Sequence, residues 1–172
     1  MMVQKMMAVA LLLLIISGCK TAYQLSSTEK FRGMWKLYRF ETLDSLSGKW
    51  SADTTRTGYS GYILYDGFGH MGVEQNPPGY KEFDVSKNID SMDNRELKKI
   101  ARLYWSNYVY FGNYTIENKT IEHKKLSATN PAEWGTSLKR DFEFKGDTLI
   151  LITQEKINGH KLRIFWLKFA GP

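Results

Sequence analysis

The run LKRDFEFKGDTLILIT, residues 138–153, decides the fold because it contains two strand-like segments joined by a short turn. In residues 138–144 apolar and charged side chains alternate, as they do in a strand with one buried face. Residues 148–153 are almost continuously apolar and rich in β-branched side chains, which is typical of a buried strand. Lys145-Gly146-Asp147 between them favours a turn. The run therefore predicts an antiparallel hairpin.

The same pattern recurs on both sides of this hairpin, with turn-forming residues between successive segments. We expect further strands at residues 34–43, 59–65, 70–75, 110–116, 120–126, 154–157 and 161–169. Consecutive hairpins predict an antiparallel sheet, because parallel neighbours need long crossovers. Eight or nine short strands favour a closed up-and-down β-barrel, since closure leaves no unpaired edge. An eight-stranded interior is either filled by side chains or holds one small ligand.

One segment breaks the sequence of strands and predicts the single inserted α-helix of an otherwise all-β domain. Asp93 followed by Glu96 has the form of a capping box. Apolar side chains then recur at helical spacing, at positions 97, 100, 101, 104 and 108. We expect a helix from about Asn94 to Val109 whose apolar stripe lies on the barrel wall or across one mouth.

The first residues predict export. Lys5, the apolar run of residues 6–16 and Ile16-Ser17-Gly18-Cys19 together resemble the lipobox signal of bacterial lipoproteins. The run is too short for a helix that crosses a bilayer. We expect residues 1–18 to be a signal peptide, residues 19–30 a lipidated Cys19 with a flexible tether, and residues 31–170 the barrel domain. The protein would then be lipid-anchored in the bacterial envelope, at the outer membrane on its periplasmic or surface side. The alternative is an ordinary signal peptide with a chance cysteine.

Charge and composition limit the partners. The formal charge of the chain is +6, and the loss of Lys5 with the signal lowers it to +5. The basic residues are scattered, whereas a nucleic-acid-binding domain shows a basic stripe. They are better explained as a solvated surface drawn weakly to anionic lipid head groups. Cys19 is the only cysteine, and the three histidines are dispersed, so we expect no intrachain disulfide, no metal site and no cofactor. We expect a monomer.

Several stretches resemble a known family. Gly33-Met34-Trp35 is similar to the G-x-W signature of the lipocalins, and the region from about residue 31 to 168 resembles the bacterial lipocalin-like domain family. The resemblance rests on residues 33–37, 61–71, 110–115, 120–123, 131–136 and 140–149. It implies a barrel with a small-ligand cavity, closed at the bottom by Trp35. We also expect Arg163, a basic residue on the last strand, to stack on that ring. The chain departs from the family pattern at Glu74, usually glutamine, and at Lys124, where a second histidine is common.

Arg140 is the main candidate for a binding residue. It shares a strand face with Leu138, Phe142 and Phe144, so we expect it inside the barrel. A guanidinium keeps its charge, and its burial therefore demands a polar partner. That partner is either the carboxylate or phosphate of a ligand, or a group of the protein such as Glu74.

The remaining candidates surround this position. His123 shares a face with Ile121 and is either a hydrogen-bonded structural residue or a ligand contact. Trp134 lies in a loop, where it either lines a mouth or plugs the interior. The full set of candidate ligand-binding residues is Arg140, His123, Phe142, Tyr110, Tyr62, Glu74 and Trp134.

Three functions fit the sequence. The leading hypothesis is a non-catalytic, membrane-tethered protein that binds a small apolar or amphipathic molecule in its barrel. The second is an enzyme, isomerase or hydrolase-like, that uses His123 or Glu74 as acid or base beside Arg140. The third is a barrel filled by its own aromatic side chains that acts as an interaction module in the envelope. Cavity volume separates the first from the third.

Overall fold

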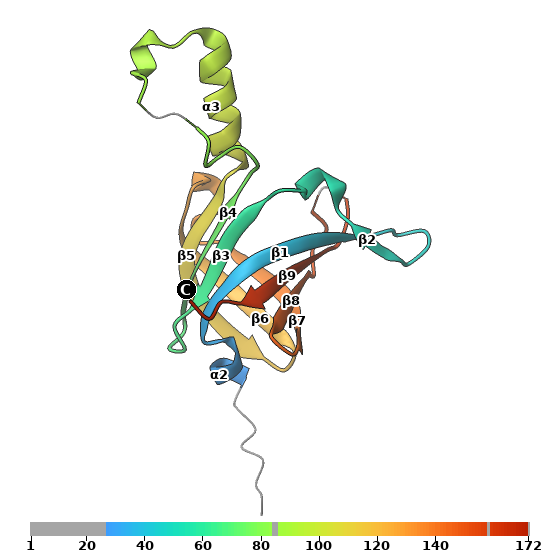
Figure 1. Cartoon of the computed structure of the whole chain (residues 1–172). Coiled ribbons are helices and arrows are strands. Elements are labelled where there is room, and N and C mark those ends of the chain that lie inside the picture. The colour runs from blue at the N-terminus through green and yellow to red at the C-terminus, as the bar shows by residue number, and fades with distance from the viewer. Residues whose placement is uncertain (1–26, 84–85, 158, 172) are drawn as a thin grey trace, which may run out of the picture.

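The computed structural model describes residues 27–83, 86–157 and 159–171 as a single closed sheet with few helices (Figure 1). All strand pairs are antiparallel in the order β2-β1-β3-β4-β5-β6-β7-β8-β9, and β1 also pairs with β9. Eight strands therefore form a closed up-and-down barrel, with β2 as an extra strand, which confirms the predicted fold class. The strands are β1 Gly33–Leu43, β2 Trp50–Ala52, β3 Ser60–Tyr65, β4 His70–Asn76, β5 Tyr108–Glu117, β6 Thr120–Ala128, β7 Ser137–Lys145, β8 Thr148–Thr153 and β9 Leu162–Lys168.

Two strand predictions need correction. β2 was not predicted; it pairs with the last residues of β1, where Leu43 faces Trp50. The predicted strand at residues 154–157 is wrong, because β8 pairs directly with β9 and only an isolated bridge joins Ile157 to His160. The turn residue Asn158 lies outside the described residues. Residues 154–157 instead form an irregular segment at the rim, which matters for the site below.

One end of the barrel is closed by aromatic side chains. The short helix α2, Ser27–Phe31, brings Phe31 into full burial. The ring of Phe31 makes edge contacts at 4.9–5.0 Å with the rings of Tyr65, Phe142 and Phe144. Its carbonyl accepts a hydrogen bond of 2.8 Å from Trp35 Nε1. Trp35 therefore lies at the closed bottom, as the family resemblance implied.

The closed end corrects two further expectations. Residues 27–30 belong to α2, so the tether cannot extend to residue 30; the remainder of the tether, Cys19 and the signal segment lie outside the described residues. Arg163 does not stack on Trp35. It lies 4.0 Å from the ring of Trp50, and the cation over Trp35, at 4.3 Å, is Lys168.

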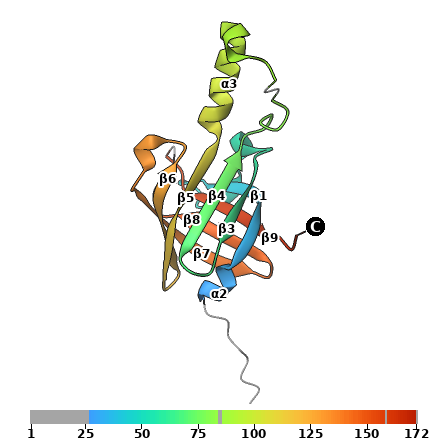
Figure 2. The ribbon, with the colours of Figure 1, turned by 90° about the vertical axis from the view of Figure 1, so that its left-hand side faces the viewer.

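The inserted helix projects away from the opposite end of the barrel. Helix α3, Asn94–Ser106, begins with the predicted capping box but contains no buried residue. It stands beyond the ends of β4 and β5, next to the loop that precedes it (Figure 2). The expectation that this stripe lies on the barrel is wrong. Tyr80 and Phe83 of the loop cover Ile100 and Leu103 instead.

Three single-turn 3-10 helices complete the fold: η1 Thr54–Arg56, η2 Ile89–Ser91 and η3 Pro131–Glu133. The last of these lies between β6 and β7, at the open end of the barrel. Within the described ranges, no helix combines the length and the hydropathy needed to cross a membrane.

Candidate functional site

The barrel interior contains a cavity of about 410 Å³ on the open side of the aromatic closed end. This volume falls in the range of natural small-molecule pockets, about 300–1,000 Å³. Most of its wall is apolar and comes from inward-facing positions of β1, β3, β4, β7, β8 and β9. The side chains that form this wall include Phe40, Ile63, Val73, Leu138, Leu151 and Trp166. The hypothesis of a completely filled barrel is therefore not supported.

Arg140 points into this cavity, as the alternation in β7 predicted. Only 5% of the residue is exposed. Its Nη1 donates a 2.6 Å hydrogen bond to Oε1 of Glu155 and a longer one, 3.3 Å, to the carbonyl of Lys139. The Glu155 side chain is 42% exposed. A deeply buried cation is thus balanced by a carboxylate that remains in contact with water at the rim.

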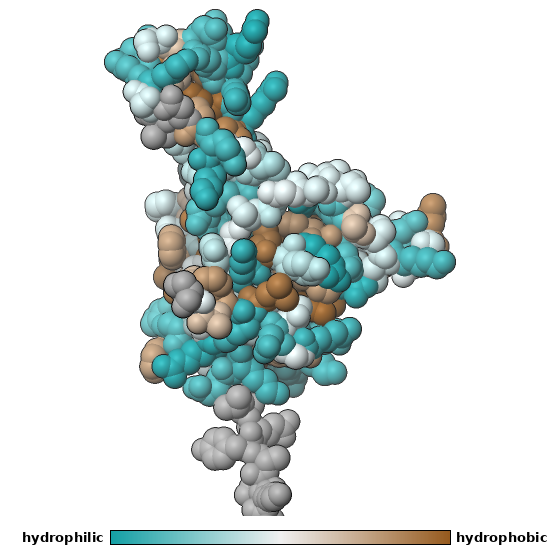
Figure 3. Space-filling model, viewed as in Figure 1, coloured by the Kyte–Doolittle hydropathy of each residue, from teal (hydrophilic) through white to brown (hydrophobic). Residues whose placement is uncertain are grey.

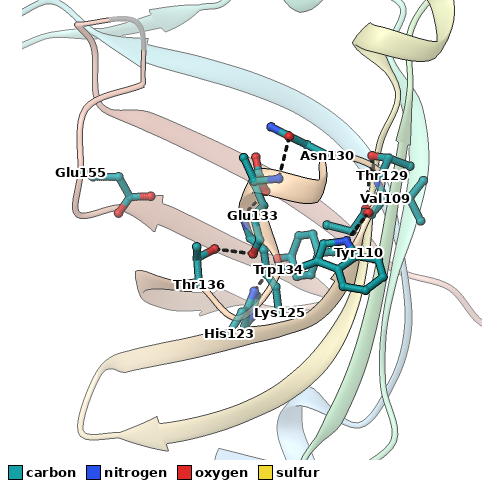
Figure 4. A network of polar contacts seen from close by, with 12 residues as sticks. Val109, Tyr110, His123, Lys125, Thr129, Asn130, Glu133, Trp134, Thr136 and Glu155 are labelled. Carbon is teal, nitrogen blue, oxygen red and sulfur yellow. Dashed lines mark hydrogen bonds and ion pairs between the residues drawn. The ribbon is translucent and has the colours of Figure 1, made fainter.

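Lys125 is a second buried cation in the cavity, and sequence reasoning missed it. It is 2% exposed and forms an ion pair with Glu133 of η3 (Figure 4). The alternation that placed His123 inward also places Lys125 inward, two residues further along β6. The sequence pattern could therefore have predicted this buried lysine. As one of the scattered basic residues, Lys125 was expected on the solvated surface.

A β-bulge follows Lys125 on β6. The register between β5 and β6 shifts between Phe111 and Gly112, so that Gly112 lies opposite Lys125. A Cβ atom on Gly112 would approach the carbonyl oxygen of Lys124 to 2.0 Å. Glycine therefore permits the close strand approach beside the bulge.

Two tyrosines flank the lysine ammonium. Lys125 Nζ lies 5.4 Å from the ring centroid of Tyr108 and 5.3 Å from that of Tyr110, within cation–π range. Burial raises the pKa of both phenols, so they stay neutral and serve as hydrogen-bonding groups. Tyr110, a predicted candidate, thus does line the cavity.

His123 is held by two phenols. Its Nε2 lies 3.0 Å from the hydroxyl of Tyr65 and its Nδ1 lies 2.7 Å from the hydroxyl of Tyr110. Burial, with the nearby charges of Arg140 and Lys125, lowers the pKa of His123 to about 3. The ring is therefore neutral, and one phenol donates to it while the other accepts. A base this weak is poorly matched to proton abstraction near neutral pH.

The structure separates the other four candidates from this cavity. Tyr62 and Glu74 pair across β3 and β4 on the outer face of the sheet, where both are exposed. The expectation that Glu74 lies inside, as a partner of Arg140 or as an acid, is wrong, because the alternation Met71, Val73, Gln75 sets the inward face of β4. Phe142 faces inward but belongs to the aromatic closed end.

Trp134 neither lines the cavity nor plugs it. The side chain is 58% exposed, and its Nε1 donates a 2.7 Å hydrogen bond to the carbonyl of Ala128 on the outside of the mouth (Figure 4). A different tryptophan contributes to the cavity wall. Trp166 is 1% exposed, and its Nε1 has no hydrogen-bond partner among the described residues.

The arrangement can bind an anion in an apolar pocket. Two buried cations reach the same cavity, and each is paired with a carboxylate from the rim, Glu133 or Glu155. A third cation, Arg56, also lines the cavity and is paired with Asp53. The described part of the chain contains no group of three or more His, Cys, Asp or Glu side chains that could bind a metal ion.

Comparison with known proteins identifies the family of the chain. No curated protein matches the chain significantly. Among solved structures, a lipocalin-like protein from Bacteroides uniformis is 13% identical with a TM-score of 0.43, over 81% of this chain and 99% of that chain. Fatty-acid-binding protein 1 of Echinococcus granulosus is 12% identical with a TM-score of 0.39, over 83% and 99%. The sequence model of the lipocalin-like domain matches residues 32–165, which is most of the chain. The protein therefore belongs to the lipocalin-like domain family.

Proposed function

We propose that the barrel binds a small amphipathic molecule whose apolar part occupies the cavity and whose anionic group lies at Arg140 and Lys125. The observation that carries this proposal is the presence of two buried cations in one largely apolar cavity of about 410 Å³. Burying a cation is costly unless a counter-charge accompanies it. An anionic ligand supplies such a counter-charge to the buried cations, whereas an uncharged apolar ligand supplies none.

When no ligand anion is present, the rim carboxylates form ion pairs with the two buried cations. Glu155 and Glu133 have side chains that are 42% and 27% exposed, while those of their partners are 6% and 3% exposed. A carboxylate near water is able to turn outward and regain its hydration. A ligand carboxylate would then exchange for Glu155 on Arg140, with one ion pair replacing another. The proposal is therefore a competition between two anions for one buried cation.

The proposal includes a non-catalytic role at a membrane. The low basicity of His123 and the outward position of Glu74 support binding over acid–base chemistry. The lipobox-like segment ending in Cys19 supports a lipid anchor in the bacterial envelope. Fractionation of a Cys19→Ser variant tests that part: we expect the protein to become soluble or to stay unprocessed, and normal processing with unchanged membrane association would contradict the anchor.

Titration calorimetry with a matched pair of probes tests the binding function. We expect dodecanoate to bind at a ratio of one per barrel and more tightly than dodecanol, which has the same chain without the charge. Charge-assisted hydrogen bonds contribute about 1.5–3 kcal/mol. Arg140→Met should therefore weaken dodecanoate binding about 10- to 100-fold and leave dodecanol binding nearly unchanged.

Lys139→Met is the matched control, because Lys139 lies on the same strand with its side chain on the outer face. It should leave both affinities unchanged. Equal affinities for the two probes would contradict the anionic head group, and binding of neither would contradict the ligand-binding function itself.

A further inference from the structure

Helix α3 has a cationic face that is not part of the barrel cavity. Arg95, Lys98, Lys99 and Arg102 recur at spacings of three and four residues, so they lie on one side of the helix. All four are exposed. With Glu96 as the only acidic residue, the helix has a net charge of +3.

Within the described part of the chain, these four cations have no ion-pair partner, and their side chains form no hydrogen bond. Glu96 does not neutralise them, because its carboxylate binds Lys87 at 2.5 Å and caps the helix through the amide of Asp93. Like charges three and four residues apart repel one another. An anionic surface beside this face would turn that repulsion into attraction.

An exposed tryptophan borders the same face. Trp105 is 87% exposed and follows Lys98 by seven residues, so the two side chains are neighbours around the helix. The more apolar stripe of Leu97, Ile100 and Leu103 is half-buried and partly covered by the loop of residues 80–83. Trp105 is left free, at the end of α3 nearest the barrel, where it also lines the cavity mouth.

The position of α3 exposes this face to a flat partner. The helix stands clear of the barrel in two perpendicular views, and its visible surface is mainly hydrophilic (Figures 1, 2 and 3). A planar anionic surface can therefore reach all four cations without touching the strands. Interfacial helices combine basic side chains with tryptophan, which favours the boundary between head groups and hydrocarbon.

We propose that α3 docks the protein on the surface of a bilayer that contains anionic lipids, with its cationic face against the head groups and Trp105 at the interface. The exposed tryptophan favours a lipid surface over an acidic protein. The contact is distinct from a lipid anchor at the N-terminus, because α2 lies at the opposite end of the barrel (Figure 1). If the proposed ligand binding holds, docking would bring the cavity mouth to the bilayer.

Co-sedimentation with vesicles tests the docking. The chain without residues 1–19 is suitable, because the complete closed sheet begins after residue 27 and a lipid anchor would mask the contact. The vesicles consist of phosphatidylcholine alone or with about one-third phosphatidylglycerol. We expect binding only to the anionic vesicles, and we expect it to weaken with added salt.

Paired variants locate the contact. Each basic residue near an anionic bilayer strengthens binding about fivefold, so Lys98→Glu with Arg102→Glu should weaken it by at least about 25-fold. Trp105→Ala should also weaken it. Lys36→Glu with Lys124→Glu makes the same charge change at exposed positions of the barrel wall and should leave most of the binding intact.

Three results would overturn the proposal. They are the absence of wild-type binding to anionic vesicles at low salt, equal losses in the two double variants, and tighter binding to polyglutamate than to the vesicles. Loss of docking with unchanged dodecanoate affinity in solution leaves the proposed ligand binding intact, so the two proposals fail separately.

Discussion

The two ends of the barrel differ in the types of side chain that they contain. At the closed end, Phe31, Trp35, Phe142 and Phe144 pack ring against ring, and none of the four lines the cavity. At the open end, strands β5, β6 and β7 place two buried cations, two phenols and a neutral imidazole around about 410 Å³ of space. The difference indicates a division of labour, in which the closed end stabilises the fold and the open end is held ready for a ligand.

This division has an energetic basis. Packed aromatic rings gain free energy from burial and from their edge contacts. Buried ion pairs gain little, because the loss of hydration offsets the attraction. Changes at the closed end should therefore alter the free energy of unfolding, whereas changes at the open end should alter affinity or pH dependence.

The largest effect should come from Phe31→Ala. Removal of a fully buried ring that contacts three others should lower the free energy of unfolding by about 3–5 kcal/mol. Denaturant unfolding measures this. Phe68→Ala is the control, because that ring is 80% exposed, and it should cost less than about 0.5 kcal/mol. Equal effects of the two changes would show that α2 does not close the barrel.

His123 should make the open end sensitive to acid. The folded-state pKa of His123, about 3, lies below the ordinary value of 6.5. Between these two pH values the imidazole is protonated in the unfolded chain and neutral in the folded protein. Stability is then fully present above pH 6.5 and falls toward pH 3, by about 1.4 kcal/mol per pH unit at most. Between pH 6.5 and 4.5, this one group should lower the free energy of unfolding of wild type by about 2 kcal/mol.

His123→Gln should lose less over the same interval, because the amide does not titrate. Unfolding measured at several pH values tests this, with His160→Gln as the control at an exposed position. Parallel pH dependence of wild type and His123→Gln would show that the buried imidazole is not the source.

Arg140→Met should change stability little, by less than about 1 kcal/mol in either direction. The variant removes a buried charge and leaves Glu155 free to hydrate, since its side chain is already 42% exposed. Thermal and denaturant unfolding measure the change. A loss of about 3–5 kcal/mol would indicate a scaffold pair and would contradict the assignment of this end to binding.

Glu155→Gln should have the smallest effect and, unlike Arg140→Met, should strengthen dodecanoate binding. If the rim carboxylate competes with the ligand for Arg140, its neutral isostere should raise dodecanoate affinity by a few-fold and leave dodecanol affinity unchanged. Calorimetry measures both. Weaker dodecanoate binding would mean that Glu155 supports the site directly and does not compete for it.

The sequence predicted the barrel more completely than the site. Local alternation is enough to define a strand and its faces, and it correctly placed Arg140 and His123 inside. The same rule, extended along β6 and β4, would have found Lys125 and excluded Glu74. Pairing of Arg140 with Glu155 was beyond such reasoning, because it depends on the path of an irregular rim segment.

The direction in which α3 projects could not be predicted from the hydrophobic pattern of the sequence either. A hydrophobic stripe shows that a helix covers something, but the partner depends on tertiary structure. Here the loop side chains of Tyr80 and Phe83 cover part of the stripe, so the barrel is not needed. Phe31 shows the opposite case, in which a residue at the edge of a polar segment is central to the closed end.

The indole N–H signals of two tryptophans test the central claim most directly. Trp35 Nε1 is bonded to Phe31 at the closed end, whereas Trp166 Nε1 is unpartnered in a residue that lines the cavity. In a proton–nitrogen correlation spectrum, saturation with dodecanoate should shift the Trp166 signal and leave the Trp35 signal in place. Shifts confined to Trp35, or to the exposed Trp134, would contradict a ligand site in the open end of the barrel.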